Sequence, residues 1–116
     1  MKVAILGARP NPERYSHQAQ LLLTEHGHEV FPVSPTGREI LGVEGMTSVP
    51  SGMGTVTLYL GPDRLMPVLN SLIAAKPRRV IFNPGTESQE AKEKLEESGI
   101  KTEEACTLVL LRTGSF

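Results

Sequence analysis

Short apolar runs alternate along this chain with segments in which apolar residues recur every three or four positions. Runs rich in β-branched and aliphatic residues occupy 2–6, 28–33, 55–60 and 79–82, and a weaker run occupies 100–103. Runs of this length and composition predict buried strands. The segments 16–26, 62–76 and 88–98 instead place their apolar residues on one helical face.

Proline and glycine mark the ends of these elements. Gly27 and Gly99 follow two of the predicted helices, where a C′ glycine commonly ends a helix, and Pro62 suits a first helical turn. Ser16 is a candidate N-cap, and Pro32 indicates that its strand lies toward a sheet edge or ends there. Strands alternating with helices predict an α/β fold, a Rossmann-like three-layer sandwich with a parallel sheet of about five strands.

Two segments do not fit this alternation. Residues 34–50 consist mainly of turn-forming residues, and a connection of this length without a helix is often functional. Residues 106–111 are apolar, and their pattern fits either a strand or a helix.

Composition narrows the class of protein. The 116 residues suit a single domain spanning 1–116, and the formal net charge of −1 argues against a nucleic-acid partner. The single cysteine, Cys106, cannot form an internal disulfide, so we expect a reducing, cytoplasmic setting. No apolar run approaches the roughly 18 residues that span a membrane. The three histidines lack metal-ligand spacing, so no metal site is expected.

The loops that follow the predicted strands are the candidate functional site. In a parallel sheet, the loops at the carboxyl ends of the strands gather at one edge, and ligands bind there. These loops are rich in glycine, proline and small hydroxyl residues, which leaves the edge open. They are residues 7–16, 34–36, 61–62 and 83–86.

The first of these loops carries phosphate-binding chemistry. Gly7 has no Cβ, so a phosphate can approach its backbone closely. Arg9 and Arg14 flank the turn and can hold phosphate oxygens through forked hydrogen bonds, and Ser16 can donate at the start of the following helix. We therefore expect a nucleotide ligand at this loop.

Two common nucleotide-binding patterns are missing. A dinucleotide site has the spacing GxGxxG, but here Gly7 is followed by Ala8, Arg9 and Pro10. The second predicted strand ends at Val33 without the acidic residue that would hold a ribose, so NAD is disfavoured. No GxxxxGK[ST] occurs anywhere, which excludes a Walker P-loop.

The stretches GARPNPERYS and HGHEVFPVSPTGREILG resemble the small CoA-binding domain proteins, relatives of the CoA-binding domain in the succinyl-CoA synthetase α subunit. The family pattern is close to GAS-x-x-P-x-R-x-S, followed by a helix, GY-x-V-x-PVNP and E-I-x-G. The matching residues are Gly7, Ala8, Pro12, Arg14, Ser16, Gly27, Val30, Pro32, Val33, Pro35, Glu39, Ile40 and Gly42. The specific part of the resemblance is the first 42 residues.

The resemblance implies that CoA or an acyl-CoA is bound without catalysis. The first loop and the 34–36 corner would hold the ADP part, and the later loops would line the pantetheine path. The expected ligand-binding residues are Gly7, Ala8, Arg9, Pro12, Arg14, Ser16, Ser34, Pro35, Thr36, Gly61, Pro62, Asn83 and Gly85. Arg9 stands where the family commonly has serine, and Thr36 stands where it commonly has lysine.

Two alternatives remain open from the residues alone. The chain is a thioester- or nucleotide-handling enzyme that uses Cys106, or it is a ligand-free interaction module. The module reading rests on the apolar segment 108–111, which would pair with a second copy or with another protein. No catalytic residue is assigned.

Overall fold

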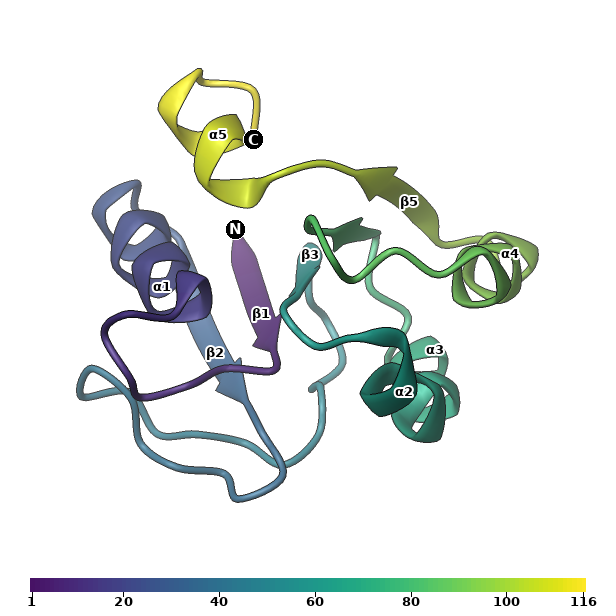
Figure 1. The fold of residues 1–116 in the computed structure, drawn as a ribbon, viewed down its shortest axis with the longest axis horizontal. Helices are drawn as coiled ribbons and strands as arrows, with labels where there is room; N and C mark the ends of the chain where they lie inside the picture. Colours follow the sequence, from purple (N-terminus) through teal and green to yellow (C-terminus); the bar gives the residue numbers. More distant parts are fainter.

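The computed structural model describes residues 1–116 and consists of five strands and a set of short helices (Figure 1). In chain order these are β1 (Lys2–Leu6), α1 (Tyr15–Glu25), β2 (Glu29–Val33), β3 (Thr55–Leu58), α2 (Pro62–Leu65), the 3₁₀ helix η1 (Met66–Val68), α3 (Leu69–Ala75), β4 (Arg79–Phe82), α4 (Gln89–Glu97), β5 (Lys101–Glu104) and α5 (Thr107–Arg112).

The strands form one parallel sheet in the order β2-β1-β3-β4-β5. This confirms the expected Rossmann-like α/β fold. The chain passes from β1 to β2 on one side and then crosses to β3 on the other, so the topological switch point lies between β1 and β3. β2 is an edge strand, which explains how it accommodates Pro32.

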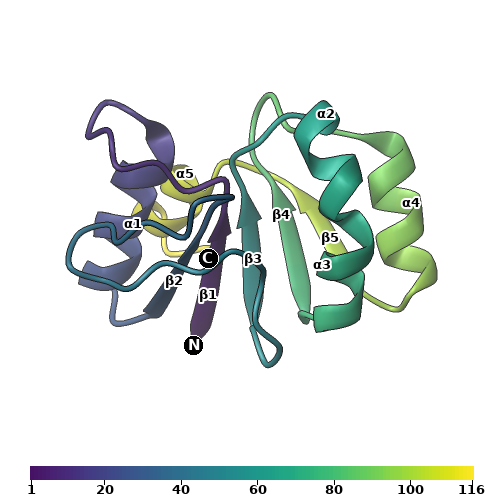
Figure 2. The ribbon, with the colours of Figure 1, turned by 90° about the horizontal axis from the view of Figure 1, so that it is seen from below.

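Helices cover both faces of the sheet. Figure 2 shows α1 and α5 on one face and α2, α3 and α4 on the other. The side chains of β1 alternate between the two layers: Val3 and Ile5 lie in the core below α1, whereas Ala4 and Leu6 lie in the larger core formed with α2 to α4. Successive side chains of a strand point to opposite faces of the sheet, so β1 contributes alternate residues to the two cores.

The connection between β2 and β3, residues 34–54, contains no helix and covers the sheet itself. Val49 and Met53 join the larger core, and Ile40 joins the core below α1. This segment thus takes the place of the helix that a βαβ unit would carry here.

Two predicted elements differ in detail, and the structure decides a third that the sequence had left open as a strand or a helix. The third strand ends at Leu58 instead of at residue 60, because its neighbours β1 and β4 end at Leu6 and Phe82. Beyond Leu6, the Gly7 N–H donates to the Val33 carbonyl and not to this strand. The helix expected over 62–76 is divided by a 3₁₀ turn at Pro67, which has no N–H to donate within a helix. Residues 107–112 form a helix. No helix is both long and apolar enough to cross a membrane.

Candidate functional site

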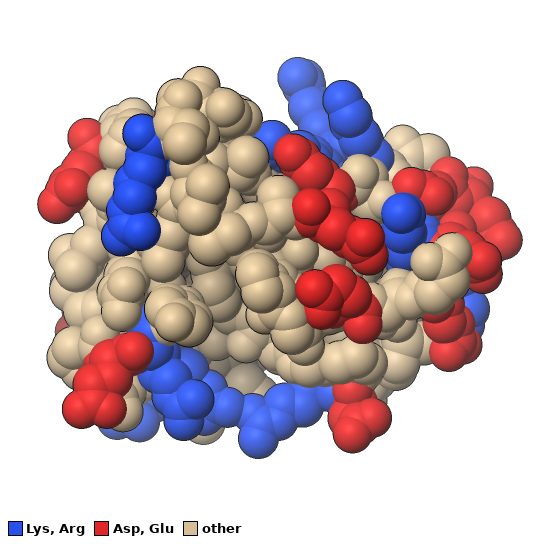
Figure 3. Space-filling view, turned by 45° about the horizontal axis from the view of Figure 1, so that its top comes forward, with Lys and Arg blue, Asp and Glu red and all other residues tan.

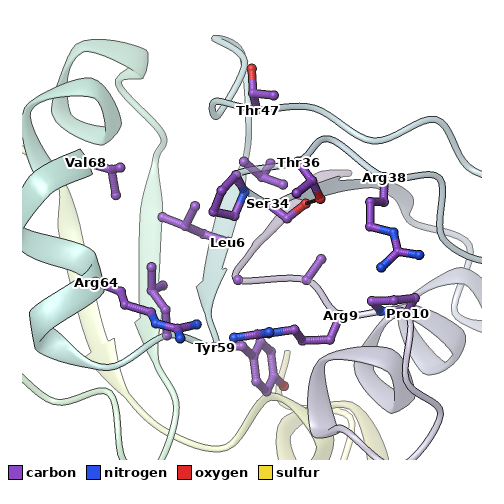
Figure 4. Close-up of a pocket in the computed structure, with 15 residues that line it drawn as sticks. Leu6, Arg9, Pro10, Ser34, Thr36, Arg38, Thr47, Tyr59, Arg64 and Val68 are labelled. Atoms are coloured by element: carbon purple, nitrogen blue, oxygen red, sulfur yellow. Dashed lines mark hydrogen bonds between the residues drawn. The ribbon is translucent and has the colours of Figure 1, made fainter.

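A cavity of about 550 Å³ opens at the carboxyl edge of the sheet, between the ends of β1, β2 and β3 (Figure 4). We call it the large cavity. Its volume lies within the usual range for small-molecule sites. It is lined by Leu6, Gly7, Ala8, Arg9, Pro10, Val33, Ser34, Pro35, Thr36, Arg38, Thr47, Tyr59, Leu60, Arg64 and Val68.

A second, more open cavity of about 230 Å³ adjoins the first, and we call it the small cavity. The two share Arg9, Tyr59 and Leu60 in their walls. The other residues that line the small cavity are Arg14, Tyr15, Ser16, Gly61, Pro84, Gly85 and Thr86. The two cavities are therefore neighbours at the same edge of the sheet.

Gly7 brings the first loop close to the end of β3. Its φ is +97°, and an added Cβ would lie 2.9 Å from the carbonyl carbon of Tyr59. The backbone N–H groups of Gly7 and Ala8 both donate to the Val33 carbonyl, at 2.9 and 3.1 Å. These bonds tie the loop after β1 to the end of β2, where the large cavity begins.

Arginine side chains dominate the charge of both cavities. Arg9, Arg38 and Arg64 line the large cavity, Arg14 lines the small one, and no acidic residue lines either. None of the four arginines takes part in an ion pair, because the two ion pairs of the structure lie elsewhere: Arg79–Glu103 and Lys94–Glu90.

Acidic side chains are most numerous on the α4 side of the molecule in Figure 3. Lys and Arg side chains run along the lower margin of that view, with a few acidic side chains beside them. A chain with a formal net charge of −1 therefore presents unpaired cations around its cavities. Unpaired guanidinium groups around a cavity favour an anionic ligand.

Ser16 does not cap α1 as expected. The helix begins at Tyr15, so Ser16 already lies inside its first turn, and no side chain caps the helix at Arg14. The hydroxyl of Ser16 instead accepts a hydrogen bond from the Arg9 N–H at 3.1 Å. This bond closes the loop between β1 and α1 and leaves the Ser16 O–H available as a donor at the small cavity.

Asn83 is buried in a polar network beneath the cavities. Its amide donates to the Thr57 hydroxyl at 2.6 Å and to the Leu58 carbonyl at 2.7 Å, and its oxygen accepts from the Thr107 N–H at 2.8 Å. The hydroxyls of Thr57 and Thr107 are 2.7 Å apart. The Asn83 side chain thus joins β3, β4 and α5, and it lines neither cavity.

Tyr59 forms the wall between the two cavities. Its hydroxyl is buried near those of Thr57 and Thr107 but has no partner at hydrogen-bonding geometry. Burial raises the pKa of Tyr59 to about 12, so the side chain stays neutral at physiological pH. The ring therefore contributes shape and an apolar surface rather than charge.

Cys106 lies at the N-cap of α5, is partly buried and lines neither cavity. The thiol enzyme considered above needs Cys106 in the ligand crevice, and it is not found there. Leu108 and Leu111 are buried and pack α5 against the chain's own core, whereas Val109 is 52% exposed. No cluster of His, Cys, Asp and Glu could hold a metal ion.

Most of the expected ligand-binding residues come together at this edge. Those that line at least one cavity are Gly7, Ala8, Arg9, Arg14, Ser16, Ser34, Pro35, Thr36, Gly61 and Gly85. Pro12 and Pro62 are exposed, Asn83 is buried, and none of the three lines a cavity.

Sequence reasoning missed Arg38, Arg64 and Tyr59. Arg38 and Arg64 each follow a strand end by a few residues, in the loop after β2 and in the short helix after β3. A search for cations in the segment that directly follows each strand would have found both. Tyr59 was assigned to a strand, and only the early end of β3 places it in the cavity wall.

Comparison with known proteins gives a consistent result. A family model described as "CoA binding domain" matches residues 1–112. Among curated proteins, the uncharacterised protein YneT of Bacillus subtilis is 26% identical over 101 residues, covering 84% of this chain and 75% of that protein.

Two proteins of solved structure have nearly the same fold. One, described only as an uncharacterised protein, is 44% identical with a TM-score of 0.94, covering 99% of this chain and 97% of that one. The other, cell-free ID.343 from Thermus thermophilus, is 29% identical with a TM-score of 0.88, covering 99% of this chain and 90% of its own. The arrangement of strands and helices is thus shared over the full length.

Proposed function

This chain belongs to the CoA-binding domain family, and we propose that it binds CoA or an acyl-CoA at the carboxyl edge of its sheet without catalysing a reaction. The observation that carries the proposal is the set of four unpaired arginines around two joined cavities that no acidic residue lines. CoA carries several phosphate charges, and arginine binds phosphate oxygens in forked geometry.

The large cavity suits the nucleotide end of the ligand. In Figure 4, the guanidinium groups of Arg9 and Arg64 point toward one another near Tyr59. Two like charges facing each other without a carboxylate between them repel, so a diphosphate placed there relieves the repulsion. Gly7 leaves room for the phosphate to approach the backbone.

The small cavity suits the pantetheine end. It continues from the large cavity past Arg9, Tyr59 and Leu60 and is bordered by the loops after β3 and β4. Pantetheine is a flexible chain with two amides. The Ser16 O–H can donate to one of these amides, and the Arg14 guanidinium is left for the diphosphate, where the two cavities adjoin.

We propose binding without catalysis because of the side chains that line the two cavities. Neither cavity is lined by a cysteine, histidine or carboxylate, and Tyr59 keeps its proton. A general base would come from these groups, and without one beside it a serine or threonine hydroxyl in the lining is a weak nucleophile.

Calorimetric titration with CoA, with ADP and NAD as comparison ligands, tests this function. We expect saturable binding of CoA that is tighter than binding of either comparison ligand. Arg14→Ala should weaken CoA binding about tenfold, the usual effect of losing a charge-assisted hydrogen bond. It should leave the urea midpoint unchanged, because Arg14 is exposed and its side chain makes no hydrogen bond or ion pair.

Arg112→Ala is the matched control, since Arg112 is equally exposed but lies at the end of α5, outside both cavities. Equal CoA affinity for wild type and Arg14→Ala would refute the phosphate role of Arg14. No saturable binding of CoA would refute the function.

A further inference from the structure

Part of the lining of the small cavity carries no charge. Arg9 and Arg14 are its only charged residues, and the proposed function assigns both to the diphosphate. The uncharged residues that line the small cavity alone come from the first turn of α1 and from the loops after β3 and β4, apart from Ser16. We call them the neutral wall: Tyr15, Gly61, Pro84, Gly85 and Thr86. The proposed orientation puts the thiol end of the ligand, with any acyl group on it, against this wall.

The neutral wall offers few hydrogen-bond donors to a ligand. The Thr86 hydroxyl donates to the Asn83 carbonyl at 2.7 Å, and the Thr86 N–H donates to the same carbonyl at 3.0 Å. The Tyr59 hydroxyl, in the neighbouring shared wall, is buried and so does not reach a ligand. What remains is the Tyr15 hydroxyl and the Gly61 N–H, which are both uncharged. No cation of the neutral wall could therefore hold a carboxylate.

Glu87 places a negative charge directly beside the neutral wall. Its carboxylate accepts a hydrogen bond from the Gly85 N–H at 2.9 Å, and Gly85 lines the small cavity. Glu87 is exposed and takes part in no ion pair, so no cation of the chain neutralises it. An acyl group that ends in a carboxylate would be repelled by this like charge.

Tyr15 gives the neutral wall an exposed apolar surface. It is the most exposed of the large apolar side chains, at 69%, and it lies in the first turn of α1. An aliphatic group that packs on its ring removes apolar area from water, which strengthens binding about fourfold for each methylene buried. Free CoA has no carbon beyond its sulfur to make this contact.

From these features we infer that the small cavity selects a short, uncharged acyl group. Its ligand is then an acyl-CoA whose acyl chain ends in carbon, in preference to free CoA and to acyl-CoAs that end in a carboxylate. The inference rests on the proposed function and narrows it to one class of thioester. Tyr15 favours the acyl chain, Glu87 disfavours a carboxylate, and the volume of about 230 Å³, which pantetheine shares, limits the chain to a few carbons.

Arg14 supports the competing outcome. If its guanidinium turned from the diphosphate to a carboxylate on the acyl group, a dicarboxylic acyl-CoA would bind most tightly. The two cases predict opposite orders of affinity for propionyl-CoA and malonyl-CoA. These ligands have acyl chains of the same length and differ in whether the chain ends in a methyl group or a carboxylate.

The experiment is a calorimetric titration of wild type with CoA, propionyl-CoA and malonyl-CoA. We expect propionyl-CoA to bind about fivefold more tightly than CoA, as for a little more than one buried methylene. Malonyl-CoA should bind about tenfold more weakly than propionyl-CoA, since it loses part of the apolar contact and meets Glu87.

Two variants assign the selection to its residues. Glu87→Gln keeps an oxygen for the Gly85 N–H but removes the charge, so malonyl-CoA should gain about fivefold while propionyl-CoA stays within about twofold. Tyr15→Ala should bring propionyl-CoA down to the affinity of CoA. The matched controls are Glu97→Gln on α4 and Leu21→Ala on α1, which are exposed and outside both cavities. Urea unfolding verifies that each variant is folded.

Malonyl-CoA binding at least as tightly as propionyl-CoA to wild type would overturn the inference and assign Arg14 to the acyl group. Equal affinities of wild type for CoA and propionyl-CoA would also overturn it. Both results leave the proposed function intact, because CoA still binds. Unchanged malonyl-CoA affinity in Glu87→Gln would overturn the role of Glu87. If none of the three ligands binds wild type, the proposed function fails together with this inference.

Discussion

Gly7 determines how closely the first loop approaches the end of β3. Its φ of +97° is strained for any residue with a Cβ, and that Cβ would also meet the Tyr59 backbone at 2.9 Å. The two effects are separable, because Gly52 has a similar φ of +85° with open space around it. At the scale of single residues, the site thus depends on one position where a side chain has no room.

We expect Gly7→Ala to lower the free energy of unfolding by about 3 kcal/mol. About 1 kcal/mol comes from the left-handed backbone and the rest from the clash with the backbone of Tyr59. Gly52→Ala, which has the strain without the clash, should cost about 1 kcal/mol. Urea unfolding of both variants measures this difference in stability. Equal losses of unfolding free energy would show that the contact with the Tyr59 backbone adds no cost at position 7.

Two polar residues show why residue roles are harder to infer than residue positions. Ser16 lies at the start of a predicted helix and Asn83 follows a predicted strand. Their positions suggested a helix cap and a ligand-binding residue, and neither residue has that role in the structure. The Ser16 hydroxyl closes a loop onto the Arg9 N–H, and the Asn83 amide is used by three backbone and side-chain partners. The partners of Asn83 are distant in sequence, and the role of Ser16 changes when the helix begins one residue earlier.

Among the elements, α4 is attached to the sheet by a narrow apolar stripe. Of its nine residues only Ala91 and Leu95 are buried, and both are completely inaccessible. The sequence predicted this arrangement from the high charge of the segment. Ser88 caps the helix by accepting a hydrogen bond from the Ala91 N–H at 3.2 Å, and the remaining side chains are solvated.

Leu95→Ala should therefore lower the free energy of unfolding by about 3 kcal/mol, the usual cost of a cavity in a packed core. Lys94→Ala is the control, since it truncates the adjacent side chain of the same helix. Lys94 forms an ion pair with Glu90 at 3.3 Å, but both side chains are largely exposed, so its loss should cost less than about 0.5 kcal/mol. Urea unfolding compares the two. Similar costs would mean that α4 is held by its charges and not by Leu95.

For the whole molecule, the two edges of the sheet differ in chemistry. The carboxyl edge is open and cationic, whereas the amino edge carries a cluster around Phe116. The Arg79 guanidinium lies 4.6 Å from the centre of the Phe116 ring, and the His28 ring lies 5.1 Å from it. The N-terminal ammonium is 3.2 Å from His28 Nδ1. This cluster brings both ends of the chain together far from the cavities.

The pKa of His28 is lowered in this cluster, first by burial and then by the N-terminal ammonium, with smaller contributions from His26 and Arg79. The folded state therefore resists protonation of His28, whereas the unfolded chain takes up the proton near the ordinary pKa of 6.5. The contribution of His28 to stability is present above that pH and is lost as the pH falls below it.

We accordingly expect wild type to lose stability between pH 7.5 and pH 5.5, and His28→Gln to lose less over the same interval. Urea unfolding at the two pH values gives both differences, and their comparison isolates His28 from other groups that titrate. An identical loss in the two proteins would contradict the assignment to His28.

The sequence by itself determined the strands, the parallel sheet and the edge at which the loops gather. These follow from local features, namely apolar periods, glycine and proline positions, and the rule that βαβ connections place successive strands in parallel. Only the tertiary structure decided the helical state of residues 107–112, whose apolar pattern fitted two periods equally well until Leu108 and Leu111 were packed into a core.

The tertiary structure also decided which side chains meet at the site. Arg38 and Arg64 are separated from Arg9 in sequence, and nothing in the local pattern assigns them to the same cavity. Their convergence depends on the crossing from β2 to β3, on the glycine contacts that hold residues 34–47, and on the early end of β3. Local patterns specify elements, whereas the direction of a side chain depends on packing between distant segments.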